Sequence, residues 1–104
     1  MNTPVNFEIG KLLRDNKQNI SSSKLMYASN GKLTDAIYDF DDWCFAPTIA
    51  KTVMWFYEKY NIWICVERND NGKFQWYVNS DKGMLEYKTP NEAYSEAIKY
   101  ILKK

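Results

Sequence analysis

The sequence predicts an α+β fold in which an antiparallel sheet carries two amphipathic helices on one face. Two segments, 46–61 and 89–103, place apolar residues at helical spacing, and each has a proline near its start. Between them, two runs of alternating apolar and polar residues flank an Asp-Asn-Gly turn. The length of 104 residues and the 45% apolar content suit one domain, so we expect a single domain over residues 1–104.

The first 45 residues carry weaker patterns. Apolar residues at positions 5, 9, 12 and 13, after a Thr-Pro pair, predict a short helix that ends near Asp15. Residues 16–23 are polar and predict a loop. The segments 24–29 and 32–38, joined through Asn30-Gly31, are candidates for an additional hairpin. Residues 39–45 are expected to form an irregular acidic and aromatic connection.

The segment 46–61 predicts a helix with Pro47 at its first helical position, where the missing N–H costs nothing. Its apolar stripe consists of Ile49, Val53, Phe56 and Tyr60, with Ala50 and Tyr57 at the flanks. Asparagine tolerates the left-handed conformation that ends many helices. We therefore expect Asn61 to end this one.

The hairpin that follows has two candidate registers. A two-residue Asn71-Gly72 turn would put the apolar faces of the two strands on opposite sides of the sheet. A three-residue loop instead sets Val66 opposite Trp76 and brings the apolar faces together. We predict the second register, with a type I turn from Asn69 and a left-handed Gly72.

Three further elements complete the chain. Residues 79–83 predict a turn, and residues 84–88 a short third strand. Thr89-Pro90-Asn91-Glu92 is a capping box with proline at the first helical position, so a helix is expected over residues 90–103.

Three segments, FEIGKLLRD at 7–15, APTIAKTVMWFYEKYNIWI at 46–64 and YKTPNEAYSEAIKYIL at 87–102, give the chain a resemblance to known sequences. It resembles short uncharacterised proteins of gut anaerobic bacteria and of their prophages and mobile elements. In that set a glycine typically ends the middle helix, where this chain has Asn61. The resemblance implies a phage or mobile-element protein without an assigned activity, and it transfers no catalytic residue.

The predicted order from residue 46 onward, α-β-β-β-α, also resembles the double-stranded-RNA-binding fold in architecture. That mode of binding needs basic residues where the second helix begins. Here the helix begins Pro-Asn-Glu-Ala-Tyr-Ser-Glu, which would repel phosphate, and the net charge is only +1. The sequence therefore disfavours nucleic-acid binding.

The absence of histidine removes imidazole catalysis and every histidine-containing metal site. Cys44 and Cys65 have no candidate base near them in the sequence, so we expect small packed side chains rather than nucleophiles. An acidic run at 35, 39, 41 and 42 does not have the spacing of an EF-hand, and a solvated loop is the simpler interpretation. We expect no cofactor and no enzymatic activity.

Aromatic residues make up 16% of the chain and supply the candidates for an interaction surface. Trp55 falls on the side of its helix away from the apolar stripe. Trp63 and Tyr77 fall on the outer face of the hairpin, where we expect the N-terminal elements to bury them rather than leave a stacking platform for single strands. Trp43 and Phe45 lie in the connection before the middle helix.

Tryptophan is strongly enriched at the energetic centres of protein interfaces. The expected function is therefore a non-catalytic module that binds another protein or itself, and the alternative is nucleic-acid binding. The longest apolar runs span five residues, too short to cross a membrane, and the N-terminus has no signal-peptide core, so we expect a cytoplasmic protein.

Overall fold

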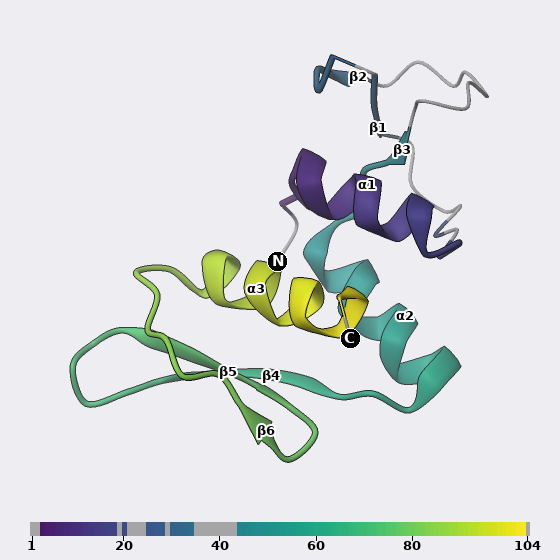
Figure 1. Cartoon of the computed structure of the whole chain (residues 1–104). Helices are drawn as coiled ribbons and strands as arrows, with labels where there is room; N and C mark the ends of the chain where they lie inside the picture. Colours follow the sequence, from purple (N-terminus) through teal and green to yellow (C-terminus); the bar gives the residue numbers. More distant parts are fainter. Residues whose placement is uncertain (1–2, 19, 21–24, 29, 35–43, 104) are drawn as a thin grey trace. The chain divides into compact units, whose positions relative to one another are not determined.

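The computed structural model describes residues 3–18, 20, 25–28, 30–34 and 44–103, which form an α+β fold (Figure 1). The chain divides into two compact units, Met1–Thr52 and Val53–Lys104. The division falls inside one continuous helix, α2 (Ile49–Tyr60). Each unit has its own antiparallel sheet.

Helix α1 (Phe7–Asp15) belongs to the first unit and ends where the sequence predicts. Its N-cap is Asn6, whose side chain accepts a hydrogen bond of 2.9 Å from the Ile9 N–H. The preceding Thr-Pro pair lies outside the helix. Pro4 instead forms an antiparallel bridge with Thr48, because the chain here runs extended beside the start of α2.

The first sheet has the strand order β2-β1-β3, with β1 at Met26–Tyr27, β2 at Leu33–Thr34 and β3 at Cys44–Phe45. The predicted hairpin is confirmed in its centre, where Gly31 has a left-handed φ of 83°. The prediction of an irregular connection is wrong for Cys44–Phe45, which pairs with β1. Local sequence could not show this, because the partner strand lies far along the chain.

Helix α2 begins two residues later than the proline pattern predicts. Thr48 occupies the cap, since its Oγ1 accepts a 3.1 Å hydrogen bond from the Lys51 N–H. Pro47 precedes the helix, and its carbonyl accepts a 2.8 Å hydrogen bond from the Val5 N–H. The predicted end is confirmed, because Asn61 has a left-handed φ of 55°.

The predicted hairpin register in the second unit is confirmed. Strands β4 (Ile64–Arg68) and β5 (Phe74–Val78) pair with Val66 opposite Trp76. Gly72 has a φ of 75°, and its N–H donates to the Asn69 carbonyl at 3.0 Å. Trp76 is 8% exposed while Tyr77 is half-buried, so the side chains of β5 point to the faces that the sequence predicts.

The third strand is predicted too late in the sequence. Strand β6 is Asp81–Lys82, within the residues 79–83 expected to form a turn, and the reversal is confined to Asn79 (φ 54°) and Ser80. Of the predicted strand 84–88, Tyr87 alone pairs with the sheet, and its backbone exchanges hydrogen bonds of 2.8 and 2.9 Å with that of Phe74. Between Gly83 and Tyr87 the chain bulges outward.

Helix α3 (Pro90–Leu102) begins at the predicted cap, where the Thr89 side chain accepts a 3.2 Å hydrogen bond from the Glu92 N–H. Its buried residues pack against β4 and β5, so α3 covers the face that carries Ile64, Trp76 and Val78 (Figure 1). The opposite face of β4 and β5 carries Trp63, Cys65, Glu67, Gln75 and Tyr77.

Candidate interaction surface

The structure separates the aromatic residues singled out from the sequence. Trp43 lies outside the described residues, and for Phe45 only the backbone is described, paired with Met26 in the first sheet. Trp55 is half-buried, with the Lys59 Nζ 4.6 Å from the centre of its ring. Trp63 and Tyr77 share the outer face of the second sheet, on neighbouring chain segments.

Trp63 is 48% exposed, so the expectation that N-terminal elements bury it is wrong. It packs edge-to-face against Tyr57 of α2, with ring centroids 5.2 Å apart and an interplanar angle of 75°. Tyr57 is itself 46% exposed, although the sequence placed it beside the core stripe. The pair is therefore a surface feature that neither segment's periodicity reveals.

Tyr77 is less accessible than Trp63. It lies opposite the half-buried Cys65, and the Lys82 Nζ is 5.9 Å from the centre of its ring. This outer face thus passes from an exposed aromatic pair to a half-buried, partly polar surface.

The backbone of β4 supplies the more specific feature. On β5, Phe74 and Trp76 direct their hydrogen bonds away from β4, to Tyr87 and Gly83. The backbone N–H and C=O groups of successive residues in a strand point to opposite sides. The groups of Gln75 and Tyr77 therefore face β4, where they bond to Glu67 and Cys65. The Asn79 N–H bond to the Trp63 carbonyl, 2.8 Å long, continues the same alternation.

It follows that the N–H and C=O groups of Ile64, Val66 and Arg68 point away from β5, along the outer edge of the sheet. No backbone hydrogen bond to these groups is found within the described ranges. The edge is five residues long and contains no proline. By contrast, the opposite edge is formed by the two-residue β6, which carries an exposed acidic and an exposed basic residue. Such short, charged edges resist further pairing. Strand β4 is longer; Ile64 at its start is 1% exposed, so Val66 and Arg68 are the residues whose outward groups are accessible.

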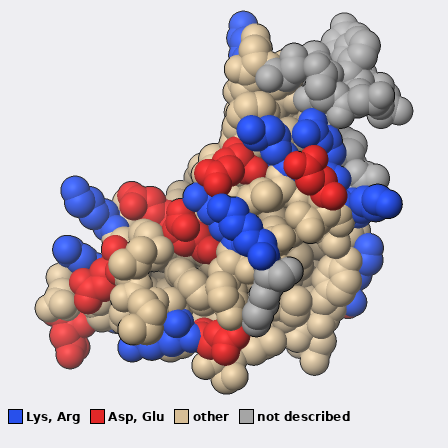
Figure 2. Space-filling view, viewed as in Figure 1, with Lys and Arg blue, Asp and Glu red and all other residues tan. Residues whose placement is uncertain are grey.

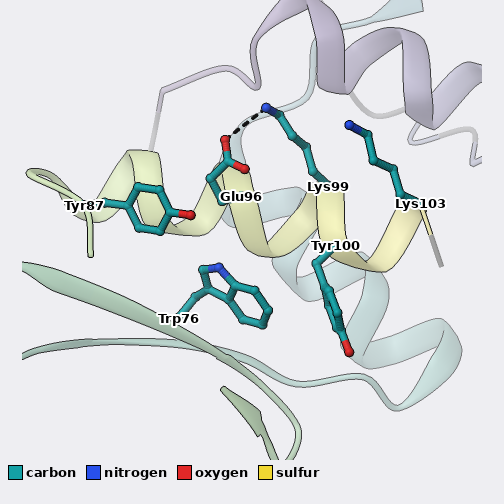
Figure 3. A pocket seen from close by; sticks show the side chains of 6 residues that line it. All are labelled: Trp76, Tyr87, Glu96, Lys99, Tyr100 and Lys103. Atoms are coloured by element: carbon teal, nitrogen blue, oxygen red, sulfur yellow. Dashed lines mark hydrogen bonds and ion pairs between the residues drawn. The ribbon is translucent and has the colours of Figure 1, made fainter. Parts of the chain in front are cut away.

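A groove along α3 is the main competing candidate (Figure 3). It has a volume of about 410 Å³ and is lined by Trp76, Tyr87, Glu96, Lys99, Tyr100 and Lys103. Volumes of this size accommodate small ligands.

The polar groups in the groove already have partners within the chain. Lys99 forms a 3.0 Å ion pair with Glu96, and the Tyr100 hydroxyl donates a 2.8 Å hydrogen bond to Asp81. Burial and the Glu96 carboxylate raise the pKa of Tyr87, and a hydrogen bond from the Trp76 side chain acts in the opposite direction. Because these contacts explain the arrangement as internal packing, the groove is the weaker candidate.

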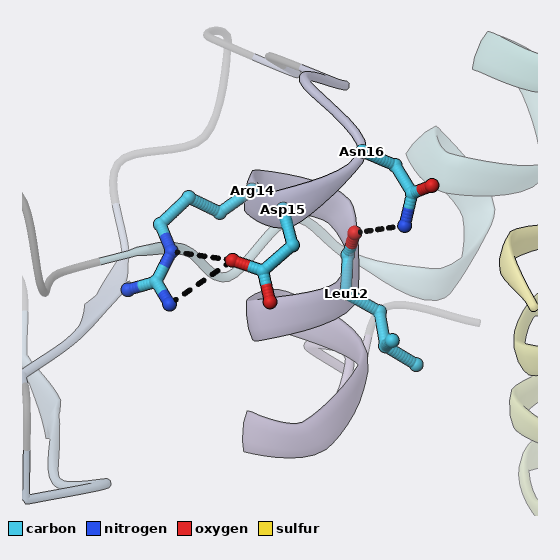
Figure 4. Close-up of polar contacts among 4 residues, drawn as sticks. All are labelled: Leu12, Arg14, Asp15 and Asn16. Atoms are coloured by element: carbon cyan, nitrogen blue, oxygen red, sulfur yellow. Dashed lines mark hydrogen bonds and ion pairs between the residues drawn. The ribbon is translucent and has the colours of Figure 1, made fainter.

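Surface charge does not single out another site on the face shown in Figure 2. Lys and Arg are interspersed with Asp and Glu over the face shown in Figure 2. Within the first unit, Arg14 pairs with the adjacent Asp15 at 3.2 Å, and Asn16 caps α1 through a 2.7 Å bond to the Leu12 carbonyl (Figure 4). The acidic run at 35, 39, 41 and 42 lies outside the described residues.

Cys44 is not arranged for nucleophilic chemistry. Cys44 is 2% exposed, and burial raises the pKa of its thiol despite the opposing influence of the cations of Arg14 and Lys11. A protonated, inaccessible thiol is a poor nucleophile. In the part of the chain that is described, no three Cys, Asp or Glu side chains gather as a metal site would require.

Comparison with protein-family models, with curated proteins and with solved structures finds no match for this chain. Among the described residues there is no helix with the length and apolar content needed to cross a membrane. The functional argument therefore rests on the edge of β4 and the aromatic pair beside it.

Proposed function

We propose that this chain is a non-catalytic protein-binding module that adds an extended polypeptide segment to the outer edge of β4. The observation that carries the proposal is the outward N–H and C=O groups of Val66 and Arg68, which are accessible, whereas Ile64 at the start of the strand is 1% exposed. Only an extended backbone presents donors and acceptors at the matching two-residue spacing.

The surroundings of the edge favour a strand with one apolar face. On the α3 side, Ile64 is 1% exposed and Val66 is half-buried, so apolar side chains of an added strand would extend this core. On the outer face, Trp63 and Tyr57 offer exposed rings at the start of β4. Backbone bonds thus provide attachment, and the rings provide side-chain selectivity.

The segments resembling proteins of prophages and mobile elements suggest such an element as the source of the module. That origin is part of the proposal. The alternative function, binding of single-stranded nucleic acid on Trp63 and Tyr77, has the exposed ring of Trp63 in its favour, but the net charge of +1 gives little attraction for phosphate.

Peptide selection with residue-level mapping tests the proposal. Peptides of about 12 residues are selected from a random displayed library, and each selected peptide is titrated into ¹⁵N-labelled protein. The expected result is that the amide signals of Val66 and Arg68, together with the Trp63 indole, shift and gain protection from hydrogen exchange. The amides of Cys65 and Glu67, already bonded to β5, should change less.

The matched variants are Val66→Pro and Trp63→Ala. Val66→Pro removes an outward N–H that β5 does not use, so binding should be lost while the β4–β5 ladder is kept. Trp63→Ala should weaken binding by removing the exposed ring. Binding that maps to the groove along α3, or an oligonucleotide that shifts Trp63 in place of any peptide, overturns the proposal.

A further inference from the structure

We infer that the segment bound at this edge carries an acidic, a basic and an apolar residue in that order, paired antiparallel with Arg68, Glu67 and Val66. This inference rests on the proposed strand addition and names the chemistry of the partner. Its basis is the pair of charged residues at the end of β4. Glu67 and Arg68 are both exposed, and as neighbours in a strand they lie on opposite faces of the sheet.

The charges of Glu67 and Arg68 are not neutralised within the sheet. On β5, Glu67 lies opposite Gln75 and Arg68 lies opposite Phe74, and both of these residues are uncharged. The Arg68 guanidinium extends over the turn, where a Cβ built on Gly72 would lie 3.4 Å from its Nη2. Among the residues that the structure describes, neither charged side chain forms an ion pair or a hydrogen bond. Both charges are therefore available to a strand on the open side of β4.

The outward backbone groups of Val66 and Arg68 set the register of that strand. In antiparallel pairing, each of these residues exchanges two hydrogen bonds with the residue directly opposite. Glu67 then faces the residue in between, in a non-hydrogen-bonded pair whose side chains lie closer together. Opposite charges across such pairs are stabilising, and like charges are destabilising. An acidic residue is thus favoured opposite Arg68, followed along the bound segment by a basic residue opposite Glu67.

The third residue of the bound segment lies opposite Val66. The Val66 side chain is half-buried on the face that packs against α3, so an apolar side chain beside it would extend that core. Ile64 is 1% exposed, which closes the edge beyond this point. The pairing is therefore confined to three residues of the segment, and the residues after the apolar one lie toward Trp63.

Two capped peptides that differ only in the order of Asp and Lys test the inference. One contains Asp-Lys-Val and the other Lys-Asp-Val, each within the same threonine-rich segment, so length, composition and net charge are identical. Each peptide is titrated into the ¹⁵N-labelled full chain, and the amide shifts of Val66 and Arg68 give its affinity. The Asp-Lys-Val peptide should bind tighter by roughly 2- to 30-fold, the effect expected from two cross-strand charge pairs.

The decisive variant exchanges the two charges of the protein by combining Glu67→Arg with Arg68→Glu, which leaves its net charge unchanged. Its preference should reverse, so that the Lys-Asp-Val peptide binds tighter by a similar factor. Lys88→Glu is the control and should keep the original preference. Lys88 is exposed and follows Tyr87, which pairs with β5 on the side away from β4. Thermal melts establish that each variant is folded. Should the exchanged variant fail to fold, Glu67→Gln, which removes one of the two charges, should still reduce the preference.

Equal affinities for the two peptides overturn the inference, and so does a preference that the exchanged variant retains. If peptides from the random library shift the amides of Val66 and Arg68 without carrying this order of residues, strand addition stands and only the assigned chemistry of the partner is wrong. If no peptide of either kind shifts these amides, both the inference and the proposed function fail.

Discussion

Gly83 lies against the indole of Trp76, and this contact makes the residue a sharp test of the fold. A Cβ at Gly83 would lie 2.6 Å from the Trp76 Nε1 and 2.8 Å from Cδ2, well inside van der Waals contact. The indole has little freedom to retreat, because its ring packs against that of Tyr100, with centroids 4.9 Å apart. Gly83→Ala should therefore cost about 1–3 kcal/mol in the free energy of unfolding, the usual range for overpacking a core.

For a domain of this size the expected cost lowers the melting temperature by roughly 5–20 °C. Calorimetry or circular dichroism measures it directly. Gly72→Ala is the matched control, because Gly72 has a φ of 75° but a Cβ there comes no closer than 3.4 Å to the flexible Arg68 side chain. That change should cost about 1 kcal/mol through backbone strain alone.

A double-mutant cycle separates the steric cause from a general loss of flexibility. Trp76→Leu removes the ring that a Cβ at Gly83 would meet, so Gly83→Ala should cost clearly less in that background. Two results refute the reasoning: a Gly83→Ala protein that melts within about 1 °C of the parent, or a cost that is the same with leucine at position 76.

Three other predictions concern stability. Asn61→Ala should destabilise by about 1 kcal/mol in urea unfolding, because alanine disfavours the φ of 55°, whereas Asn61→Gly should be neutral or stabilising. Thr89→Ala should cost about 1 kcal/mol by removing the cap of α3, and Thr89→Ser should restore most of it. Burial raises the folded-state pKa values of Cys44 and Tyr94 above their ordinary values of 9.0 and 10.0, so the folded state favours the protonated forms. Their stabilisation is complete below pH 9 and is lost as pH rises through the raised values, so the melting temperature should fall above pH 9, with a smaller initial fall in Cys44→Ala.

Local signals predicted much of the second unit. The register of β4 and β5 was predictable because a one-residue slip would have reversed every side chain, which leaves Val66 opposite Trp76 as the consistent arrangement. The cap at Thr89 and the left-handed Asn61 were predictable because each satisfies backbone groups within a few residues.

Predictions failed where the deciding partner lay elsewhere in the chain. Cys44–Phe45 becomes a strand only because β1 is available to it. Strand β6 begins earlier than its composition suggests, because Asn79 accepts a left-handed conformation and reverses the chain within two residues. The residues after Gly83 then bulge away, which leaves Met84 and Leu85 at 89% and 66% exposed, although their apolar character favoured a strand.

For the candidate site, the sequence predicted the outer face on which Trp63 lies but not that β4 is an edge strand. Trp63 could be placed on the outer face by alternation, but whether β4 is an inner or an outer strand depends on which side of β5 the chain turns after Val78. It turns away from β4, and β6 bonds to the free side of β5. The same reversal that covers one side of β5 leaves the backbone groups of Val66 and Arg68 facing outward, so the short reversal at Asn79 determines which strand forms the edge of the sheet.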